Sequence, residues 1–315
     1  MTTFNTQSLL AGFGRVKENN GCAGVDGVTI ARFERHLVDN IRCLEQELAF
    51  QTYLPLPLRQ ILVDKGNGEA RALSVPAVRD RVVQSTALSV IEPILDREFE
   101  DCSFAYRKGR SVRQAVERIR QFYNDGFHWV VNADIDAFFD SVEHRLMREK
   151  VQHFIKDPEL VRLIGLWLAA EIWDGKHLRQ VERGIPQGSP VSPILANLFL
   201  DELDEALLAA GLRLVRFADD FIILCRTSEA AQKALAKTRD VLAELHLTLD
   251  EEEIISFDQG FKYLGVLFVK SLVMAPFDRP KKEHRVLHVA GTLDVVDYMR
   301  RRREGGLSYG PSLSD

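Results

Sequence analysis

Two adjacent aspartates, Asp219 and Asp220, interrupt an otherwise apolar segment, RFADDFIIL at residues 216–224. Burying a carboxylate is unfavourable unless the group is paired, hydrogen-bonded or bound to a cation. The apolar runs on both sides predict two buried strands that fold back at the aspartates, so that the turn holds both carboxylates in a fixed place. An Ala-Asp-Asp turn is common in isolation because aspartate favours turns, and a catalytic interpretation therefore needs a further carboxylate nearby.

A second carboxylate-bearing strand is predicted in the segment HWVVNADIDAFFD at residues 128–140. Side chains alternate between the two faces of a strand, which places Asp134 and Asp136 on the face opposite the apolar residues. If this strand lies beside the turn, Asp134, Asp219 and Asp220 converge, and three ionised carboxylates stay together only around a cation. Oxygen ligands suit Mg²⁺ or Mn²⁺, and two such ions can stabilise the attacking and leaving oxygens of a phosphoryl transfer.

The hydrophobic pattern predicts the elements that must position these aspartates. Helices are predicted at residues 37–48, about 80–94, 111–123, 158–173, 191–199 and 228–245. Paired extended runs are predicted at residues 56–76, around a Gly-Asn-Gly turn, and at 261–269. Asp140 and Glu143 resemble a helix-capping pair, which predicts a helix start at Asp140. The order strand, helix, strand pair, helix, strand favours an α+β fold with helices on one face of an antiparallel sheet.

Length and composition set broad limits. The 315 residues are enough for about two domains, and four cysteines without C-x-x-C spacing argue against a disulfide scaffold or a structural zinc site. No apolar run reaches the ~18–20 residues that span a bilayer and no signal peptide is evident, so we expect a cytoplasmic protein that does not bind membranes. The net charge of −5 gives no whole-chain indication of nucleic-acid binding. Local basic segments lie at residues 106–120, 279–285 and 300–303.

Six segments, in order between about Gly24 and Val269, resemble the motifs of reverse transcriptases. The resemblance is to the prokaryotic group II intron type and its CRISPR-associated and defence-related relatives. The segments are KGNGEARALSVPAVRDRVVQ, SFAYRKGRSVRQAV, ADIDAFFDSVEH, GIPQGSPVSPILANLFLDELD, RFADDFIIL and FKYLGVLF. One such motif could arise by chance, whereas six in the family's order could not plausibly do so.

The resemblance implies a fold and a domain plan. We expect an α+β right-hand polymerase fold, with helical and β fingers, a palm of antiparallel sheet backed by helices, and a thumb that is short or absent. The expected parts are fingers with N-terminal helices at residues 1–127, a palm at 128–269, and a short basic tail, serving as a partial thumb or linker, at 270–315.

The resemblance also implies roles for the aspartate cluster. Asp134 and Asp219 would hold two Mg²⁺ ions, or Mn²⁺, with Asp220 beside them. Ile135 would offer a backbone carbonyl to the metal. Phe139 would lie beneath the incoming sugar and clash with a 2′-hydroxyl, which selects deoxynucleotides. Plain core packing is the alternative for Phe139, because its neighbours are apolar.

Nucleotide and strand contacts follow from the same resemblance. Lys65 and Arg71 flank the Gly-Asn-Gly turn and would hold the triphosphate through charge-assisted contacts. Gln187 lies in a Gly-rich loop that the family places against the nucleotide. The RNA template and DNA primer would contact Arg107, Lys108, Arg110, Gly188, Tyr263, Leu264 and Gly265, with the three cations touching template phosphates.

The sequence departs from the family pattern at three places. Phe217 stands where the family commonly has a tyrosine beside the aspartates. Glu253 aligns with a lysine that protonates the departing pyrophosphate; a carboxylate is a poor general acid at neutral pH unless its pKa is raised, so Lys262 is a candidate substitute. Only 46 residues, 270–315, follow the primer-gripping segment, which is short for a helical thumb and favours a weak grip or a thumb supplied by a partner.

The leading interpretation is an RNA-directed DNA polymerase that adds dNTPs to a 3′-hydroxyl by two-metal phosphoryl transfer. Two alternatives stay open. One is template-independent or protein-primed DNA synthesis in phage defence, and the other is a polymerase-like module that binds nucleic acid or a partner protein without catalysis. The resemblance is strongest to CRISPR-associated enzymes, so one expected setting is spacer acquisition from RNA, with a CRISPR spacer integrase as partner and a longer chain of which these residues are a fragment.

Overall fold

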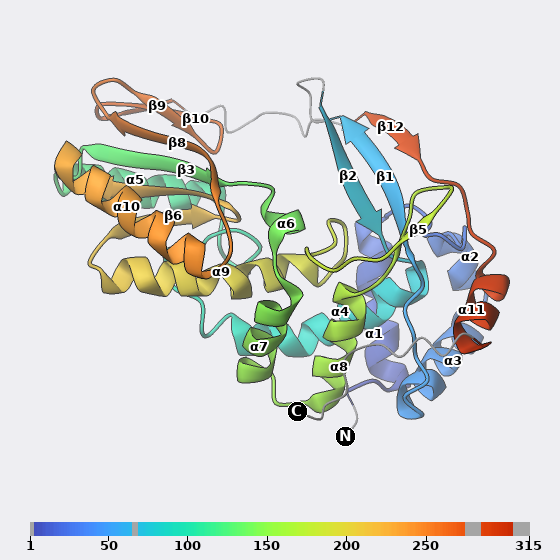
Figure 1. Cartoon of the computed structure of the whole chain (residues 1–315). Coiled ribbons are helices and arrows are strands. Elements are labelled where there is room, and N and C mark those ends of the chain that lie inside the picture. The colour runs from blue at the N-terminus through green and yellow to red at the C-terminus, as the bar shows by residue number, and fades with distance from the viewer. Residues whose placement is uncertain (1–2, 65–68, 275–284, 305–315) are drawn as a thin grey trace.

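A computed structural model describes residues 3–64, 69–274 and 285–304 of the chain (Figure 1). Its helices are α1 Thr6–Asn19, α2 Ile30–Arg35, α3 Leu37–Ala49, α4 Val78–Leu95, α5 Val112–Asn124, α6 Phe138–Ser141, α7 His144–Phe154, α8 Pro158–Leu168, α9 Ser192–Ala209, α10 Ser228–Glu244 and α11 Val295–Glu304. Its strands are β1 Leu58–Asp64, β2 Ala70–Val75, β3 Trp129–Ile135, β4 Ile172–Trp173, β5 Leu178–Arg179, β6 Arg213–Phe217, β7 Asp220–Cys225, β8 Leu249–Ser256, β9 Phe261–Tyr263, β10 Val266–Val269, β11 Leu272–Met274 and β12 Val286–Val289.

Four antiparallel strands in the order β6-β7-β3-β8 form a sheet that we call the central sheet. Strands β6 and β7 are the two predicted runs around the aspartates, and β3 is the predicted second strand. The register places Asp134 of β3 directly opposite Asp220 of β7, so the convergence expected from the alternation of β3 and the turn is present. Strand β3 ends at Ile135, and Asp136 lies beyond it in a turn.

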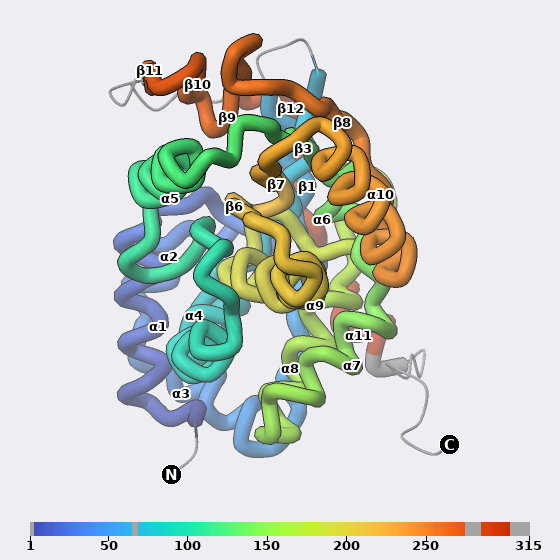
Figure 2. The backbone as a smooth tube through the Cα atoms, turned by 90° about the vertical axis from the view of Figure 1, so that its left-hand side faces the viewer, coloured from blue at the N-terminus to red at the C-terminus, as the bar shows by residue number. Residues whose placement is uncertain are grey.

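The central sheet is covered on both faces, whereas the sequence pattern predicted helices on one face. On one face, Val131 and Ile223 join the main core together with residues of α9 and α10. On the other face, Val130 and Ile222 pack against Ile119 of α5 and against the small sheet β11-β10-β9. Figure 2 shows α5 and α10 on opposite sides of this sheet. Because both faces of the sheet are covered, its polar groups gather at one end, where β3 stops and β6 turns into β7.

A second sheet, which we call the outer sheet, contains β1, β2, β4, β5 and β12. Strand β1 pairs with β2 in antiparallel register, as the paired extended run predicted, and also with β12 and β4. The turn predicted at residues 66–68 lies outside the described residues. Helices α1, α3 and α4 share the main core with the central sheet, whereas buried residues of the outer sheet, among them Leu58, Ile61 and Val63, form smaller clusters of their own.

Local capping explains where several helices begin. The side chain of Asn5 accepts a hydrogen bond from the backbone N–H of Ser8, and the Ser8 hydroxyl accepts one from the Asn5 N–H in return, which starts α1. The predicted start at Asp140 is wrong: residues 138–141 form the short α6, and α7 begins at His144. Glu143 makes no capping bond, and its carboxylate lies 2.5 Å from Nδ1 of His246.

Candidate active site

The turn between β6 and β7 holds Asp219 at its tip and Asp220 at the start of the returning strand. Ala218 adopts a left-handed conformation with φ of 63°, which is uncommon for a residue other than glycine and needs support from its surroundings. Arg216 supplies that support, because its Nη1 donates to the Ala218 carbonyl at 3.0 Å. The sequence therefore builds the turn around a buried cation.

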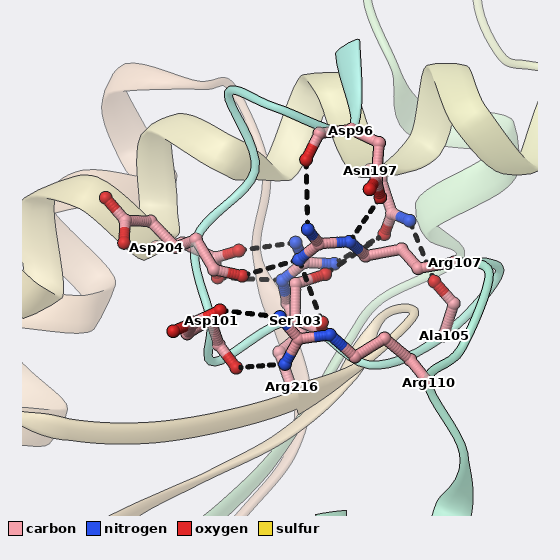
Figure 3. A network of polar contacts seen from close by, with 10 residues as sticks. Asp96, Asp101, Ser103, Ala105, Arg107, Arg110, Asn197, Asp204 and Arg216 are labelled. Atoms are coloured by element: carbon pink, nitrogen blue, oxygen red, sulfur yellow. Dashed lines mark hydrogen bonds and ion pairs between the residues drawn. The ribbon is translucent and has the colours of Figure 1, made fainter. Parts of the chain in front are cut away.

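Arg216 is the centre of a buried polar network (Figure 3). Its side chain is fully buried, and its guanidinium forms a two-bond ion pair with Asp204 of α9, with Nε 2.7 Å from Oδ1. Nη1 also donates to Asn197 Oδ1 at 3.0 Å, and Asn197 in turn donates to the carbonyl of Ala105 at 2.9 Å. The network fixes the aspartate turn relative to α9 and to the loop before α5.

Burial raises the pKa of all three carboxylates at the turn. Burial raises the pKa of Asp220 to about 7, and the charges of Asp134 and Asp219 add to that rise. Burial and the Asp219 charge likewise raise the pKa of Asp134 to about 6, although the Ile135 N–H donates to its Oδ1 at 3.0 Å. Burial also raises the pKa of Asp219, against the opposing charges of Arg71 and Arg216. These shifts identify a cluster of carboxylates that lacks a sufficient counter-charge.

A cavity of about 850 Å³ opens beside the turn. It brings together seven of the residues that the sequence predicted for the site: Arg71, Asp134, Ile135, Phe139, Gln187, Gly188 and Asp219. Asp220 is not on this wall and reaches the cluster through its pairing with Asp134. Lys65 lies outside the described residues.

The floor of the cavity is fixed by backbone contacts between two loops. The Ile185 N–H donates to the Phe139 carbonyl at 2.6 Å. A Cβ at Gly184, whose φ is 97°, would lie 2.8 Å from that same carbonyl, so only glycine fits. The Ser74 N–H donates to the Gln187 carbonyl at 2.6 Å, which ties the Gly-rich loop to β2. The segment of Phe139, predicted to select the sugar, and the loop of Gln187, predicted to contact the nucleotide, are therefore both held by backbone hydrogen bonds.

The donor set fits a hard divalent cation in part. In residues 3–64, 69–274 and 285–304, no group of three or more His, Cys, Asp or Glu side chains is arranged to hold a metal ion. Mg²⁺ typically uses one or two carboxylates and completes its shell with water and substrate phosphates. Asp134 and Asp219, which both line the cavity, provide such a pair. Metal binding by them stays a prediction.

The three predicted template cations are each paired with a carboxylate, and Figure 3 shows two of them, Arg107 and Arg110. Arg107 pairs with Asp96 at 2.7 Å and donates to the carbonyl of Glu100, so its side chain is almost completely buried. Arg110 pairs with Asp101. Lys108 is exposed and pairs with a glutamate of α4 at 2.8 Å. None of the three lines the cavity, and their contact with a template stays a prediction.

Tyr263 is a buried support of the aspartate turn. Its hydroxyl lies 3.1 Å from the carbonyl of Asp220 and 3.2 Å from that of Val215. Leu264 and Gly265 form the turn between β9 and β10, with φ of 50° and 77°. The primer contact predicted for these three residues remains untested by this geometry.

The departure at Glu253 is visible in β8. Glu253 is exposed and lies opposite Asn132, and Lys262, its candidate substitute, is exposed on β9. Neither lines the cavity, whereas Asp250 does, and its charge acts on Asp134. The sequence therefore provides no cation from β8 at this wall of the cavity.

Sequence reasoning missed several residues of the cavity. Tyr106 lines it with half of its surface exposed and with φ of 60°, and its hydroxyl is close enough to Asp219 for that charge to raise its pKa. Arg15 and Arg81 line the wall formed by α1 and α4. The basic segment around Tyr106 was a signal that could have found it, whereas Arg15 and Arg81 stand in ordinary helical patterns.

Comparison with known proteins gives a consistent result. Residues 63–268 match the family model described as reverse transcriptase (RNA-dependent DNA polymerase). Protein YkfC of Escherichia coli strain K12 is 30% identical over 283 residues, covering 77% of this chain and 74% of that protein. The group II intron-encoded protein LtrA of Lactococcus lactis subsp. cremoris is 31% identical over 179 residues, covering 56% of this chain and 30% of LtrA.

The fold has a counterpart among solved structures. Apo telomerase from Candida tropicalis matches with a TM-score of 0.57 and 12% identity, over 79% of this chain and 55% of that one. At this identity the likeness concerns the fold alone, and it confirms the expected α+β polymerase architecture. No helix in the described part of the chain is long and apolar enough to cross a membrane.

Proposed function

Since this chain belongs to the reverse transcriptase family, the RNA-directed DNA polymerases, we propose that it extends a 3′-hydroxyl with deoxynucleotides copied from an RNA template. The observation that carries this proposal is the cavity in which Asp134 and Asp219 face Arg71, Phe139 and Gln187. A carboxylate pair, a cation and an aromatic side chain on one wall are the groups that a nucleotide and a metal would need. The group II intron-like resemblance is supported by LtrA, of which this chain spans less than a third.

The proposal assigns the catalytic roles to the aspartate cluster. Asp134 and Asp219 would hold two Mg²⁺ ions, which supply the positive charge that stabilises attacking and leaving oxygens in an in-line phosphoryl transfer. The Ile135 carbonyl would add a ligand. Asp220, paired with Asp134 across the sheet, adds negative charge that favours a cation at this place. Arg216 holds the turn so that Asp219 keeps its position.

The substrate roles are assigned to other residues that line the same cavity. Arg71 acts on Asp219 through its charge and is therefore close enough to hold the triphosphate beside the metal ligands. Phe139 would lie against the sugar, and the Gly-rich loop at Gln187 against the base or template. In this plan, residues 1–127 serve as fingers, 128–269 as the palm, and 270–315 as a tail.

Primer extension tests the proposal directly. Purified protein would be incubated with Mg²⁺ or Mn²⁺, labelled dNTPs and a DNA primer annealed to RNA, beside an Asp219→Asn/Asp220→Asn variant. We expect extension coded by the template and its loss in the variant. Product formed without template would favour the untemplated alternative. No incorporation by the wild-type protein under any of these conditions would contradict the polymerase assignment and favour the binding module.

The biological setting is a separate proposal. The resemblance of the six motifs to CRISPR-associated enzymes supports spacer acquisition from RNA, with a spacer integrase as partner. Joint purification of the chain with a Cas1-type integrase, followed by a search for DNA copies of RNA in the integrated products, tests this setting. Absence of a stable complex would favour a stand-alone enzyme.

A further inference from the structure

The wall of the cavity formed by α1 and α4 carries two arginines that no role above explains. Arg15 of α1 and Arg81 of α4 both line the cavity, together with Asn19 and Gly21. Asp134 and Asp219 line the same cavity. The cavity is therefore acidic at the catalytic turn and basic at the N-terminal helices.

Arg81 is buried without a carboxylate partner. Its side chain is 7% exposed, Nη2 donates to the carbonyl of Cys22, and Nε is buried with no hydrogen-bond partner. Within the described residues it forms no ion pair; burial lowers the pKa of its guanidinium, and the charges of Asp26 and Asp80 act against that shift without direct pairing. Arg216 offers the contrast, because it is completely buried and is paired directly with Asp204. A buried charge without an ion-pair partner is strongly unfavourable, so a bound anion would stabilise the Arg81 guanidinium.

Arg15 supports the same conclusion from another helix. Its Nη2 donates to the Ser85 carbonyl at 2.6 Å, and in the part of the chain that the structure describes it too forms no ion pair. A guanidinium has five N–H donors, so a single carbonyl leaves most of them for a ligand. Two guanidinium groups held by backbone carbonyls on adjacent helices form a site with fixed geometry, which suits a phosphate.

The position of the two arginines indicates which phosphate they bind. In the described residues, the arginines whose charge acts on Asp219 are Arg71 and Arg216. Arg15 and Arg81 stand on α1 and α4, and their charges are not among those that act on Asp219. A triphosphate must reach the metal ligands, whereas the backbone of a bound strand passes across the whole cavity. The strand whose 3′-hydroxyl reacts belongs at the aspartates, which leaves the template for the helical wall.

We propose that Arg15 and Arg81 form a phosphate-binding subsite for the backbone of the template strand. The inference rests on the proposed polymerase function and extends it to a new part of the molecule. Because phosphate contacts carry no sequence information, the subsite positions the template and contributes salt-dependent affinity.

Gly21 provides a variant that changes the subsite without changing any charge. A Cβ at Gly21 would lie 2.5 Å from Nη1 of Arg81 and otherwise near only Cζ of the same side chain. Gly21→Ala therefore displaces the guanidinium and leaves the charge count intact. Arg15→Gln and Arg81→Gln remove the charges, and Arg81→Lys keeps one. Lys233→Gln, on the exposed face of α10, is the matched control for loss of a remote positive charge.

Equilibrium binding of annealed primer–template, without dNTPs, would be measured by fluorescence anisotropy between about 50 and about 300 mM KCl. We expect Arg15→Gln and Arg81→Gln each to reduce the slope of log affinity against log salt by about 0.7–0.9. Each loss should weaken binding about tenfold, the size of one charge-assisted contact. Gly21→Ala should weaken binding like Arg81→Gln, and Arg81→Lys less. KM for dNTP should stay within about twofold in all variants, since the proposal assigns the two arginines to the template strand and not to the triphosphate.

Three outcomes would overturn the proposal. Slopes equal to that of Lys233→Gln would show that the arginines contact no phosphate. A raised KM for dNTP with unchanged strand affinity would assign the subsite to the triphosphate. Loss of folding in Arg81→Gln, read from thermal unfolding, together with normal affinity in Gly21→Ala, would make Arg81 a structural residue. Because strand binding is measured without catalysis, a wild-type protein that binds but does not extend contradicts the polymerase function and not the subsite.

Discussion

At the scale of single residues, two adjacent phenylalanines have separate tasks. Phe138 is 1% exposed and packs against Phe199, with ring centroids 6.2 Å apart. Phe139 is half-buried and lines the cavity. The backbone of Phe139 is held in place, because the Ile185 N–H donates to its carbonyl and Gly184 packs closely against that carbonyl. The room left for a sugar is therefore set by the Phe139 side chain.

Phe139→Ala should relax the choice of sugar. Removing the ring opens space for a 2′-hydroxyl, so the ratio of kcat/KM for a dNTP over the matching rNTP should fall by about 10-fold to 100-fold. Single-nucleotide incorporation on a primer–template measures both constants. Discrimination equal to that of the wild-type protein would return Phe139 to a packing role.

Phe138→Leu is the control for this experiment. The change lies one residue away in the core and should lower the free energy of unfolding by about 1 kcal/mol without altering sugar discrimination. A similar loss of discrimination in both variants would mean that general loosening of α6, and not the Phe139 ring, is responsible.

At the residue scale, the sequence predicted features that depend on neighbouring residues in the chain, but not features that depend on contacts formed by folding. The pairing of Asp134 with Asp220 could be predicted, because strand alternation and a tight turn are local properties. The state of Arg107 could not, because its partner Asp96 and the carbonyl of Glu100 meet it only after the chain has folded around it. A basic segment indicates cations but not which of them are already paired.

At the scale of elements, the Arg216 network joins three parts of the chain. It links the β6–β7 turn through Ala218, α9 through Asp204, and the loop before α5 through Asn197 and the Ala105 carbonyl. Since Asp219 follows Ala218 directly, the position of this proposed metal ligand depends on contacts to α9. Variants of this network can therefore test separately whether Arg216 stabilises the fold and whether it positions Asp219.

A double-mutant cycle on Arg216 and Asp204 tests that separation. Arg216→Met leaves a buried carboxylate unpaired and Asp204→Leu leaves a buried guanidinium unpaired, so each should lower the free energy of unfolding by about 3–5 kcal/mol. The double variant leaves no unpaired charge and should recover more than half of the loss, measured by urea unfolding. Primer extension should stay impaired in the double variant, because the Ala218 carbonyl still lacks its donor. Full activity there would show that Arg216 stabilises the fold without positioning the turn.

Element-scale prediction succeeded where a pattern is regular. Helices with an apolar stripe, such as α5 and α10, and the strands β3, β6 and β7 were found near their observed bounds. Strand β12 was missed because all four of its residues are exposed, so no alternation marks it. Its strand conformation comes from pairing with β1 more than 200 residues earlier, which no local pattern contains.

At the scale of the whole molecule, the C-terminal segment returns to the N-terminal part. After β11, the described chain resumes at β12 on the outer sheet and continues into α11 (Figure 1). Arg59 Nε donates to the Ala290 carbonyl at 2.6 Å, and the hydroxyl of Tyr298 donates to Glu171 at 2.6 Å. Trp173 Nε1 donates to the Gly291 carbonyl at 2.9 Å. In residues 285–302 the tail therefore pairs with and packs on the outer sheet, and its role as a partial thumb or linker stays a prediction.

Deletion of residues 285–315 should therefore loosen the outer sheet and leave the central sheet intact. Strand β1 would lose its β12 partner at Ile61, Leu62 and Val63. Since β1 also pairs with β2, which carries Arg71, KM for dNTP should rise as well. Hydrogen exchange followed by mass spectrometry should show amides of β1 exchanging about 10-fold to 100-fold faster, with β3 unchanged.

Tyr298→Phe tests the same support of the outer sheet with a smaller change than the deletion. It removes the hydrogen bond to Glu171 and the one that the hydroxyl accepts from Arg302 Nη1 at 2.8 Å, each worth about 1 kcal/mol, while the strand pairing stays in place. Exchange in β1 should then rise less than in the deletion. Equal acceleration of exchange in β1 and β3 after the deletion would mean that the two sheets unfold as one cooperative unit. Unchanged exchange in both strands would mean that the outer sheet is stable without β12.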